Sequence, residues 1–177
     1  LVHIMKDGQP VKMSKRSGNM VTLEEVVDEV GKNVARFFFL NRKADAELQF
    51  DVNLALSQSN ENPMYYIQYA FVRTVSIARN ACEQNFAPAS KITHDFNESE
   101  KLLFKKICSL KNLIFNISQN HQIHLLAYFT YELAALFHQF YNQKRIIETS
   151  EPEQTAQRLY LVNIIQETLK TSLFLMG

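Results

Sequence analysis

Lys12 and Lys15 are the residues whose type and spacing could do chemistry on a small ligand. They stand three positions apart, with Ser14 between them and Gly18 shortly after. An ammonium group is a compact point charge for phosphate oxygens, and a serine hydroxyl can add a hydrogen bond. Glycine supplies the backbone freedom that a closing loop needs. The pattern favours a loop that closes over a polyphosphate, although arbitrary basic segments near a terminus are more often solvated loops.

The order of residues in this segment is more specific than its charge. Residues 12–19 read Lys-Met-Ser-Lys-Arg-Ser-Gly-Asn, which resembles the KMSKS loop of class I aminoacyl-tRNA synthetases. The resemblance implies catalytic roles for Lys12 and Lys15, which would stabilise the triphosphate as pyrophosphate leaves. The segment departs mildly from the motif at one position: Arg16 stands where the motif usually has its last serine. The implied ATP-binding residues are Lys12, Met13, Ser14, Lys15 and Arg16.

Three later stretches narrow the resemblance to bacterial-type arginyl-tRNA synthetases. They are residues 34–40, 50–70 and 131–142, and the last is similar to the helical anticodon-binding domain of that family. The resemblance covers essentially the whole chain. No HIGH-type His-x-Gly-His occurs in it, so most of the catalytic domain is missing. We therefore expect a C-terminal piece of a longer enzyme that does not catalyse the reaction alone.

The resemblance also implies the reaction and its partners. ATP, with Mg²⁺, and L-arginine would form arginyl-adenylate in the full-length enzyme, and the arginyl group would pass to tRNA(Arg). No tightly bound cofactor is expected in this piece. Two alternatives stay open: the related C-terminal region of cysteinyl-tRNA synthetase, and a non-catalytic helical module that binds RNA or protein. Asn62-Pro63 with the following tyrosines favours the arginine enzyme.

Composition is that of an ordinary globular protein. The chain has 177 residues, 46% hydrophobic and 21% charged, which suffices for one core plus an appendage. Cys82 and Cys108 are far apart and lack C-x-x-C spacing, so a reducing compartment, the cytoplasm, is expected. No apolar run reaches membrane-spanning length. We expect no membrane and no DNA partner, and a monomer.

Charge is segregated along the chain although the net charge is only +1. Residues 44–61 are acidic, whereas residues 101–147 hold six cations against the single acid Glu132. A protein that touches RNA on one side shows such a pattern, and solvated helix faces show it about as often. The six cations are Lys101, Lys105, Lys106, Lys111, Lys144 and Arg145.

Capping signals and periodicity predict an all-α fold, a helical bundle preceded by a short β-hairpin and loop remnant of a catalytic domain. Asp7-Gly8 is a hairpin-turn dipeptide, Thr22 with Glu25 forms a capping box, Asn97 with Glu100 caps a later helix, and Asn62-Pro63 starts a helix. We divide the chain into residues 1–20, a connecting segment 21–50 and a tRNA-binding domain 51–177. Expected helices cover residues 22–30, 34–41, 51–60, 63–84, 97–117 with a break near 110–112, 123–145 and 154–175.

An aromatic face on the helix from Pro63 is the second candidate site. At 100° per residue, Tyr65, Tyr69 and Arg73 fall opposite the apolar face. They pack against another element, or they stack unpaired bases while the arginine takes a phosphate, as in single-stranded RNA loops. The family resemblance favours RNA. The expected tRNA-binding residues are Tyr65, Tyr66, Tyr69, Arg73, Tyr141 and Arg145, of which the last two are an i, i+4 pair on the long helix 123–145.

A metal site is not expected. His121 and His124 could share an ion, but no third ligand lies within a turn, because His138 is 14 residues further along the same helix.

Overall fold

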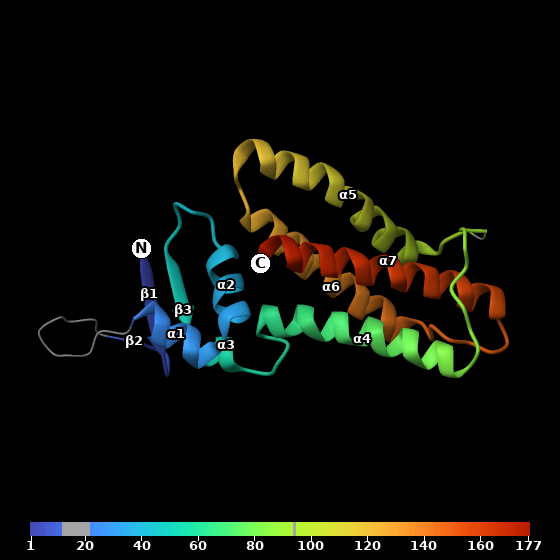
Figure 1. Ribbon diagram of the computed structural model, residues 1–177, viewed down its shortest axis with the longest axis horizontal. Helices are drawn as coiled ribbons and strands as arrows, with labels where there is room; N and C mark the ends of the chain where they lie inside the picture. The colour runs from blue at the N-terminus through green and yellow to red at the C-terminus, as the bar shows by residue number, and fades with distance from the viewer. Residues whose placement is uncertain (12–21, 94) are drawn as a thin grey trace, which may run out of the picture.

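The computed structural model describes residues 1–11, 22–93 and 95–177. The loop residues assigned to ATP, 12–16, lie outside the described residues, and so do the two candidate catalytic lysines among them. A small sheet and three short helices lie at one end of a bundle of four long helices, with the end of the last helix beside the second short one (Figure 1). This arrangement confirms the predicted helical bundle with a strand remnant.

The sheet has three strands, one more than predicted. β1 (Val2–Lys6) pairs antiparallel with β2 (Gln9–Pro10) across the Asp7-Gly8 turn, where both residues have positive φ. The predicted hairpin is therefore confirmed. β3 (Leu48–Asp51) adds to the other side of β1 in parallel. The sequence did not reveal it, because only Leu48 and Phe50 alternate into the core and their partner strand is over forty residues away.

The predicted helix over residues 51–60 is wrong in extent. Asp51 ends β3, and its carboxylate accepts a hydrogen bond from the Leu54 amide at 3.1 Å, which starts the one-turn helix α3 (Val52–Leu56). Asn62 explains why the helix stops early. Its buried side-chain amide donates to the carbonyls of Ala55 (2.9 Å) and Ser57 (3.0 Å), which supports the extended chain that leads into the next helix.

Two helices connect the strands of the sheet. α1 (Leu23–Val30) has the predicted capping box between Thr22 and Glu25, and Gly31 follows it at φ 86°. α2 (Lys32–Leu40) buries Phe37 and Phe38, and the Phe38 ring packs 5.5 Å from the Phe50 ring of β3. The phenylalanine run therefore packs against β3.

The bundle consists of α4 (Pro63–Glu83), α5 (Glu98–Asn120), α6 (His124–Gln143) and α7 (Pro152–Met176). α5 begins with the predicted Asn97/Glu100 capping box, but the predicted break near residues 110–112 is wrong. Neither glycine nor proline stands there, and Leu110, Leu113 and Ile117 continue the face that packs on the core.

The core lies between α4, α6 and α7. The predicted inner face of α4 is confirmed by the buried side chains of Ile67, Ala70, Thr74 and Ile77. Long apolar side chains from the other two helices meet it: Leu133, Phe137 and Phe140 from α6, and Leu159, Val162, Ile165 and Leu169 from α7. Across the described parts of the chain, none of the helices has both the length and the apolar character that a bilayer crossing requires.

Candidate nucleic-acid interface

A cluster of aromatic side chains forms along the seam where α4 lies against α6. α4 contributes Tyr66, Tyr69 and Arg73, which stand at i, i+3 and i+7 and therefore share one flank of the helix. α6 contributes Tyr131, His138 and Tyr141 at the same kind of spacing. We call these six residues the α4–α6 aromatic cluster.

Arg73 lies at the centre of this cluster. Its guanidinium is 4.4 Å from the Tyr69 ring centroid and 4.2 Å from the Tyr141 ring centroid. Nη2 donates to the Tyr69 hydroxyl at 2.6 Å, and Nη1 donates to His138 Nδ1 at 3.0 Å. A cation between two aromatic rings is favourable through the ring quadrupoles, and more so where water is partly excluded. Arg73 thereby fixes one tyrosine from each helix.

The hydrogen bonds of His138 define its tautomer. Arginine can only donate, so Nδ1 must be the acceptor, and Nε2 carries the proton that it donates to the Tyr66 carbonyl at 3.2 Å. Burial is the main cause that lowers the pKa of His138; the Arg73 charge lowers it further, and the bond to Tyr66 opposes them. The imidazole is thus held neutral inside a positively charged cluster.

The outer rings of the cluster reach solvent. Tyr66 is partly buried against the rings of His138 (4.4 Å) and Tyr131 (5.4 Å), and burial raises its pKa. Tyr69 and Tyr141 are 42% and 38% exposed. Tyr65 lies nearly parallel to Tyr69, with ring centroids 6.3 Å apart and planes 10° apart. Flat, partly exposed and immobilised rings are suitable platforms for nucleic-acid bases.

A cavity of about 400 Å³ continues the cluster towards the end of α6. Tyr141 lines it together with Arg145, whose side chain is 80% exposed. Most of the remaining lining is polar: Asn80 from α4, Gln84 directly after it, and Asn142, Gln143 and Lys144 from α6 and the loop that follows. The cavity therefore offers amide groups for base edges and two cations for phosphates.

The structure brings together all six residues that the sequence assigned to tRNA. Tyr65, Tyr66, Tyr69 and Arg73 lie on one flank of α4, while Tyr141 and Arg145 line the cavity beside them. The expectation that Tyr69 and Arg73 point away from the core needs correction, because both make contacts with α6. A helical wheel describes one helix and cannot show that a neighbour covers its flank.

Three residues of the site were missed from the sequence. His138 was weighed only as a metal ligand, although it stands three residues before Tyr141 and hence on the same face of α6. Tyr131 stands seven residues, or two helical turns, before His138, so its spacing also places it on that face. Asn80 falls on the same side of α4 as Tyr69 and Arg73 by helical periodicity, but its place in the cavity depends on the loop after α6 lying across the end of α4.

The basic segment 101–147 is less free than its charge suggests. Lys106 pairs with Glu132, and its ammonium lies 4.8 Å from the Phe129 ring centroid. Lys101 pairs with Glu98 at 2.9 Å. Arg73, in contrast, belongs to the aromatic cluster, and Lys144 and Arg145 line the cavity beside it.

The two histidines considered as metal ligands, His121 and His124, take part in a helix end and in side-chain packing. His121 ends α5 in the left-handed conformation at φ 58°, and His124 is buried in the first turn of α6 with its ring 5.5 Å from Tyr128. No group of three or more His, Cys, Asp or Glu suitable for a metal ion occurs within residues 1–11, 22–93 and 95–177.

Comparison with known proteins identifies the relatives of this chain. Residues 67–177 match the DALR anticodon binding domain. The arginine–tRNA ligases of Citrifermentans bemidjiense and Bacillus subtilis are 44% and 38% identical to the whole chain, which spans only 32% of either relative. The matched part is their C-terminal third.

Solved structures share the fold. The structure of a Campylobacter jejuni protein described as an arginyl-tRNA synthetase superposes with a TM-score of 0.86 at 28% identity, over 100% of this chain and 38% of that one. The Thermus thermophilus arginyl-tRNA synthetase superposes with a TM-score of 0.74 at 22% identity, over 98% and 33% of the two chains. The chain belongs to the DALR anticodon-binding family and corresponds to the C-terminal third of arginine–tRNA ligases.

Proposed function

We propose that the α4–α6 aromatic cluster and the adjoining cavity bind the anticodon stem and loop of tRNA(Arg). The observation that carries the proposal is the Tyr69–Arg73–Tyr141 sandwich, in which a guanidinium holds two partly exposed rings from different helices. Unpaired bases of a loop stack on such rings, and each stack is worth about 1 to 3 kcal/mol.

Arg73 and Arg145 take different roles in this proposal. Both terminal nitrogens of Arg73 already bond within the protein, so Arg73 holds the rings in place. Arg145 projects into solvent at the rim of the cavity and is the residue that contacts a phosphate. The sequence predicts a phosphate contact for Arg73; the proposal assigns that contact to Arg145 instead.

The whole protein is, on this proposal, a cytoplasmic, monomeric ATP-dependent arginine–tRNA ligase. The names of its relatives and the Lys-Met-Ser-Lys motif support that activity. Lys12 and Lys15 would act on ATP, bound with Mg²⁺ beside L-arginine in the catalytic domain of the full-length enzyme. Residues 1–20 belong to that domain, 21–50 connect it and 51–177 bind tRNA.

Direct titration with tRNA tests the interface. The parent chain, Tyr69→Ala and Tyr141→Ala are titrated with tRNA(Arg), with the same tRNA carrying a changed anticodon, and with duplex DNA, over a series of salt concentrations. Each variant should lose about 5- to 150-fold in affinity for tRNA(Arg), with the salt slope unchanged because no charge is removed.

Lys111→Gln is the matched control, because it removes an exposed cation of α5 that lies outside the cluster. It should change the dissociation constant by less than about twofold. Unchanged tRNA affinity in both tyrosine variants, with binding of a protein partner lost instead, would contradict the proposal and make the cluster a protein-docking surface.

A further inference from the structure

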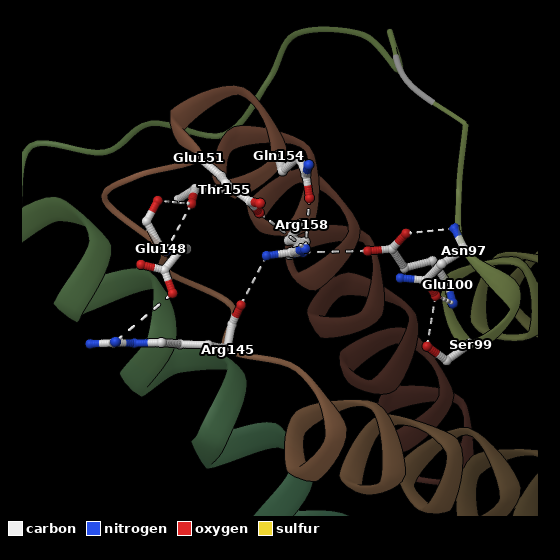
Figure 2. A network of polar contacts seen from close by, with 9 residues as sticks. All are labelled: Asn97, Ser99, Glu100, Arg145, Glu148, Glu151, Gln154, Thr155 and Arg158. Carbon is white, nitrogen blue, oxygen red and sulfur yellow. Dashed lines mark hydrogen bonds and ion pairs between the residues drawn. The ribbon is translucent and has the colours of Figure 1, made fainter.

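A buried arginine joins three chain segments behind the cavity (Figure 2). Arg158 stands in the second turn of α7, and its side chain is only 11% exposed. Its Nη1 donates to the Arg145 carbonyl at 3.0 Å, and its Nη2 donates to Gln154 Oε1 at 2.8 Å. Its Nε lies 3.5 Å from Oε1 of Glu100, which is 9% exposed at the start of α5. One guanidinium thus ties α5 and α7 to the loop after α6.

The choice of a charged pair at this place has a physical meaning. Removing a carboxylate and a guanidinium from water costs free energy, and an apolar pair would pack two helices at lower cost. Apolar side chains cannot hold a backbone carbonyl at a defined position, whereas a guanidinium can. We therefore ascribe the Arg158–Glu100 pair to positioning: it orients the guanidinium that holds the backbone at Arg145.

The backbone is held on both sides of Arg145. The Lys144 amide donates to the Phe140 carbonyl at 3.0 Å and closes α6, while Arg158 donates to the carbonyl of Arg145. Three residues on, the amide and the carbonyl of Glu148 both bond to the hydroxyl of buried Thr155 at 2.9 Å.

The side chain of Arg145 is left to project from this fixed backbone. Figure 2 shows it directed away from Arg158, towards its own weak contact with Glu148 at 3.9 Å. A cation on a fixed backbone loses less entropy on meeting a phosphate than one on a mobile loop, so the clamp favours binding.

We propose that Arg158 is a positioning residue for RNA binding, which holds the loop 144–151 so that Arg145 stands beside Tyr141 at the rim of the cavity. The proposal rests on the proposed tRNA-binding function. Arg158 itself is largely buried and engaged with four partners, the fourth being Glu151 at 3.8 Å, so it acts through Arg145.

A double-mutant cycle tests this inference. Dissociation constants for tRNA(Arg) are measured over a salt series for the parent chain, Arg145→Gln, Arg158→Gln and the double variant. Each single variant should weaken binding by about 3- to 30-fold. Each should also lower the salt slope by about 0.7, the value for one phosphate contact to a single strand. The double variant should bind within about twofold of Arg145→Gln, because both changes remove the same contact.

Two further variants separate positioning from general stability. Leu103→Ala removes a fully buried side chain of α5 that makes none of these polar contacts, and should lower the thermal midpoint while affinity and salt slope stay those of the parent. Arg158→Lys keeps the charge opposite Glu100 but cannot bond all four partners at once, so it should fold and lose an intermediate amount of affinity. It also stands in for Arg158→Gln if that variant does not fold.

The outcomes that overturn the two proposals differ. Parent-like affinity in both Arg158 variants, while Arg145→Gln weakens binding, overturns the positioning role and leaves the proposed interface intact. Losses that add fully in the double variant also overturn it, because Arg158 would then act elsewhere. Parent-like affinity in Tyr69→Ala, Tyr141→Ala and Arg145→Gln together overturns the interface, and the positioning role with it.

Discussion

At the scale of single residues, one arginine organises the candidate RNA surface. Arg73 meets two rings and a histidine at the same time because its planar guanidinium offers separate N–H groups along its edge and a flat face on each side. A lysine in this place would keep the charge but not the geometry.

Arg73→Lys should therefore weaken tRNA binding with the salt slope unchanged. An ammonium cannot bond the Tyr69 hydroxyl and His138 together while filling the space between two rings, so the tyrosines lose their fixed orientation. We expect a loss of about 1 to 2 kcal/mol in binding free energy and a lower thermal midpoint, measured by tRNA titration and circular dichroism. Parent-like affinity would show that the rings are oriented without the guanidinium.

His138 should make stability fall as the solution becomes mildly acidic. Its folded-state pKa lies below the usual value of 6.5, so the unfolded chain binds more protons as the pH falls through that value. The stability contribution is complete above the unfolded pKa and is lost as the pH drops from about 7 towards the folded pKa.

Denaturant titrations between pH 5 and 8 measure this effect as a difference. His138→Gln is the comparison, because its amide can accept from Arg73 and donate to the Tyr66 carbonyl without titrating. The free energy of unfolding of the parent should fall relative to that of the variant below about pH 6.5. Parallel curves for the two proteins would contradict the assignment of this slope to His138.

At the scale of elements, a single asparagine organises the approach to α4. Asn62 is buried, its Oδ1 accepts from the amides of Met64 and Tyr65, and its amide group donates to two carbonyls at the end of α3. One side chain therefore starts the helix that carries the aromatic cluster and ties it to the end of α3.

Asn62→Ala should destabilise the chain by about 2 to 3 kcal/mol. The substitution removes a helix cap, worth about 1 kcal/mol, and leaves two carbonyls without their donor. Chemical denaturation measures the change, with Asn60→Ala as a control at an exposed position in the same connection. A loss for Asn62→Ala no larger than that of the control would mean that Pro63 and packing alone define this helix start.

At the scale of the whole molecule, the candidate RNA surface and the small sheet occupy different parts of the structure. The bundle presents the candidate RNA surface along α4 and α6, whereas the small sheet, α1, α2 and α3 occupy one end of it (Figure 1). α2 contacts α4, α6 and α7, and Arg36 donates from Nε to the Met176 carbonyl at 2.5 Å. The connecting segment is thus packed on the bundle.

ATP-dependent activation should be absent from this chain and sensitive to its loop in the full-length enzyme. The 177-residue chain should show no ATP–pyrophosphate exchange above buffer. On the proposed function, Lys15→Ala in the full-length protein should lower the activation rate by about 100- to 1,000-fold while tRNA affinity changes little, because the role proposed for the lysine is to stabilise charge that develops in the transition state. Equal losses in activation and tRNA affinity would assign this lysine to RNA binding.

The sequence by itself determined the family and most of the helix starts. Local signals at Asp7-Gly8, Thr22 with Glu25, Asn62-Pro63 and Asn97 with Glu100 each marked a turn or helix start, because caps and turns depend on neighbouring residues alone. The six residues assigned to tRNA also came from the sequence. α5 showed the limit of local signals, since the spacing of its apolar residues suggested a break that the helix does not have.

Only the tertiary structure decided what these residues contact. β3 exists because Leu48 and Phe50 pair with a strand over forty residues away, which no local pattern encodes. Arg73 faces α6 and not solvent because a second helix covers that flank of α4. The clamp of Arg158 on the Arg145 carbonyl joins α7 to the loop after α6 through a backbone atom, which has no residue-type signal at all. Side-chain type is written in the sequence, whereas the partner of each polar group depends on long-range packing.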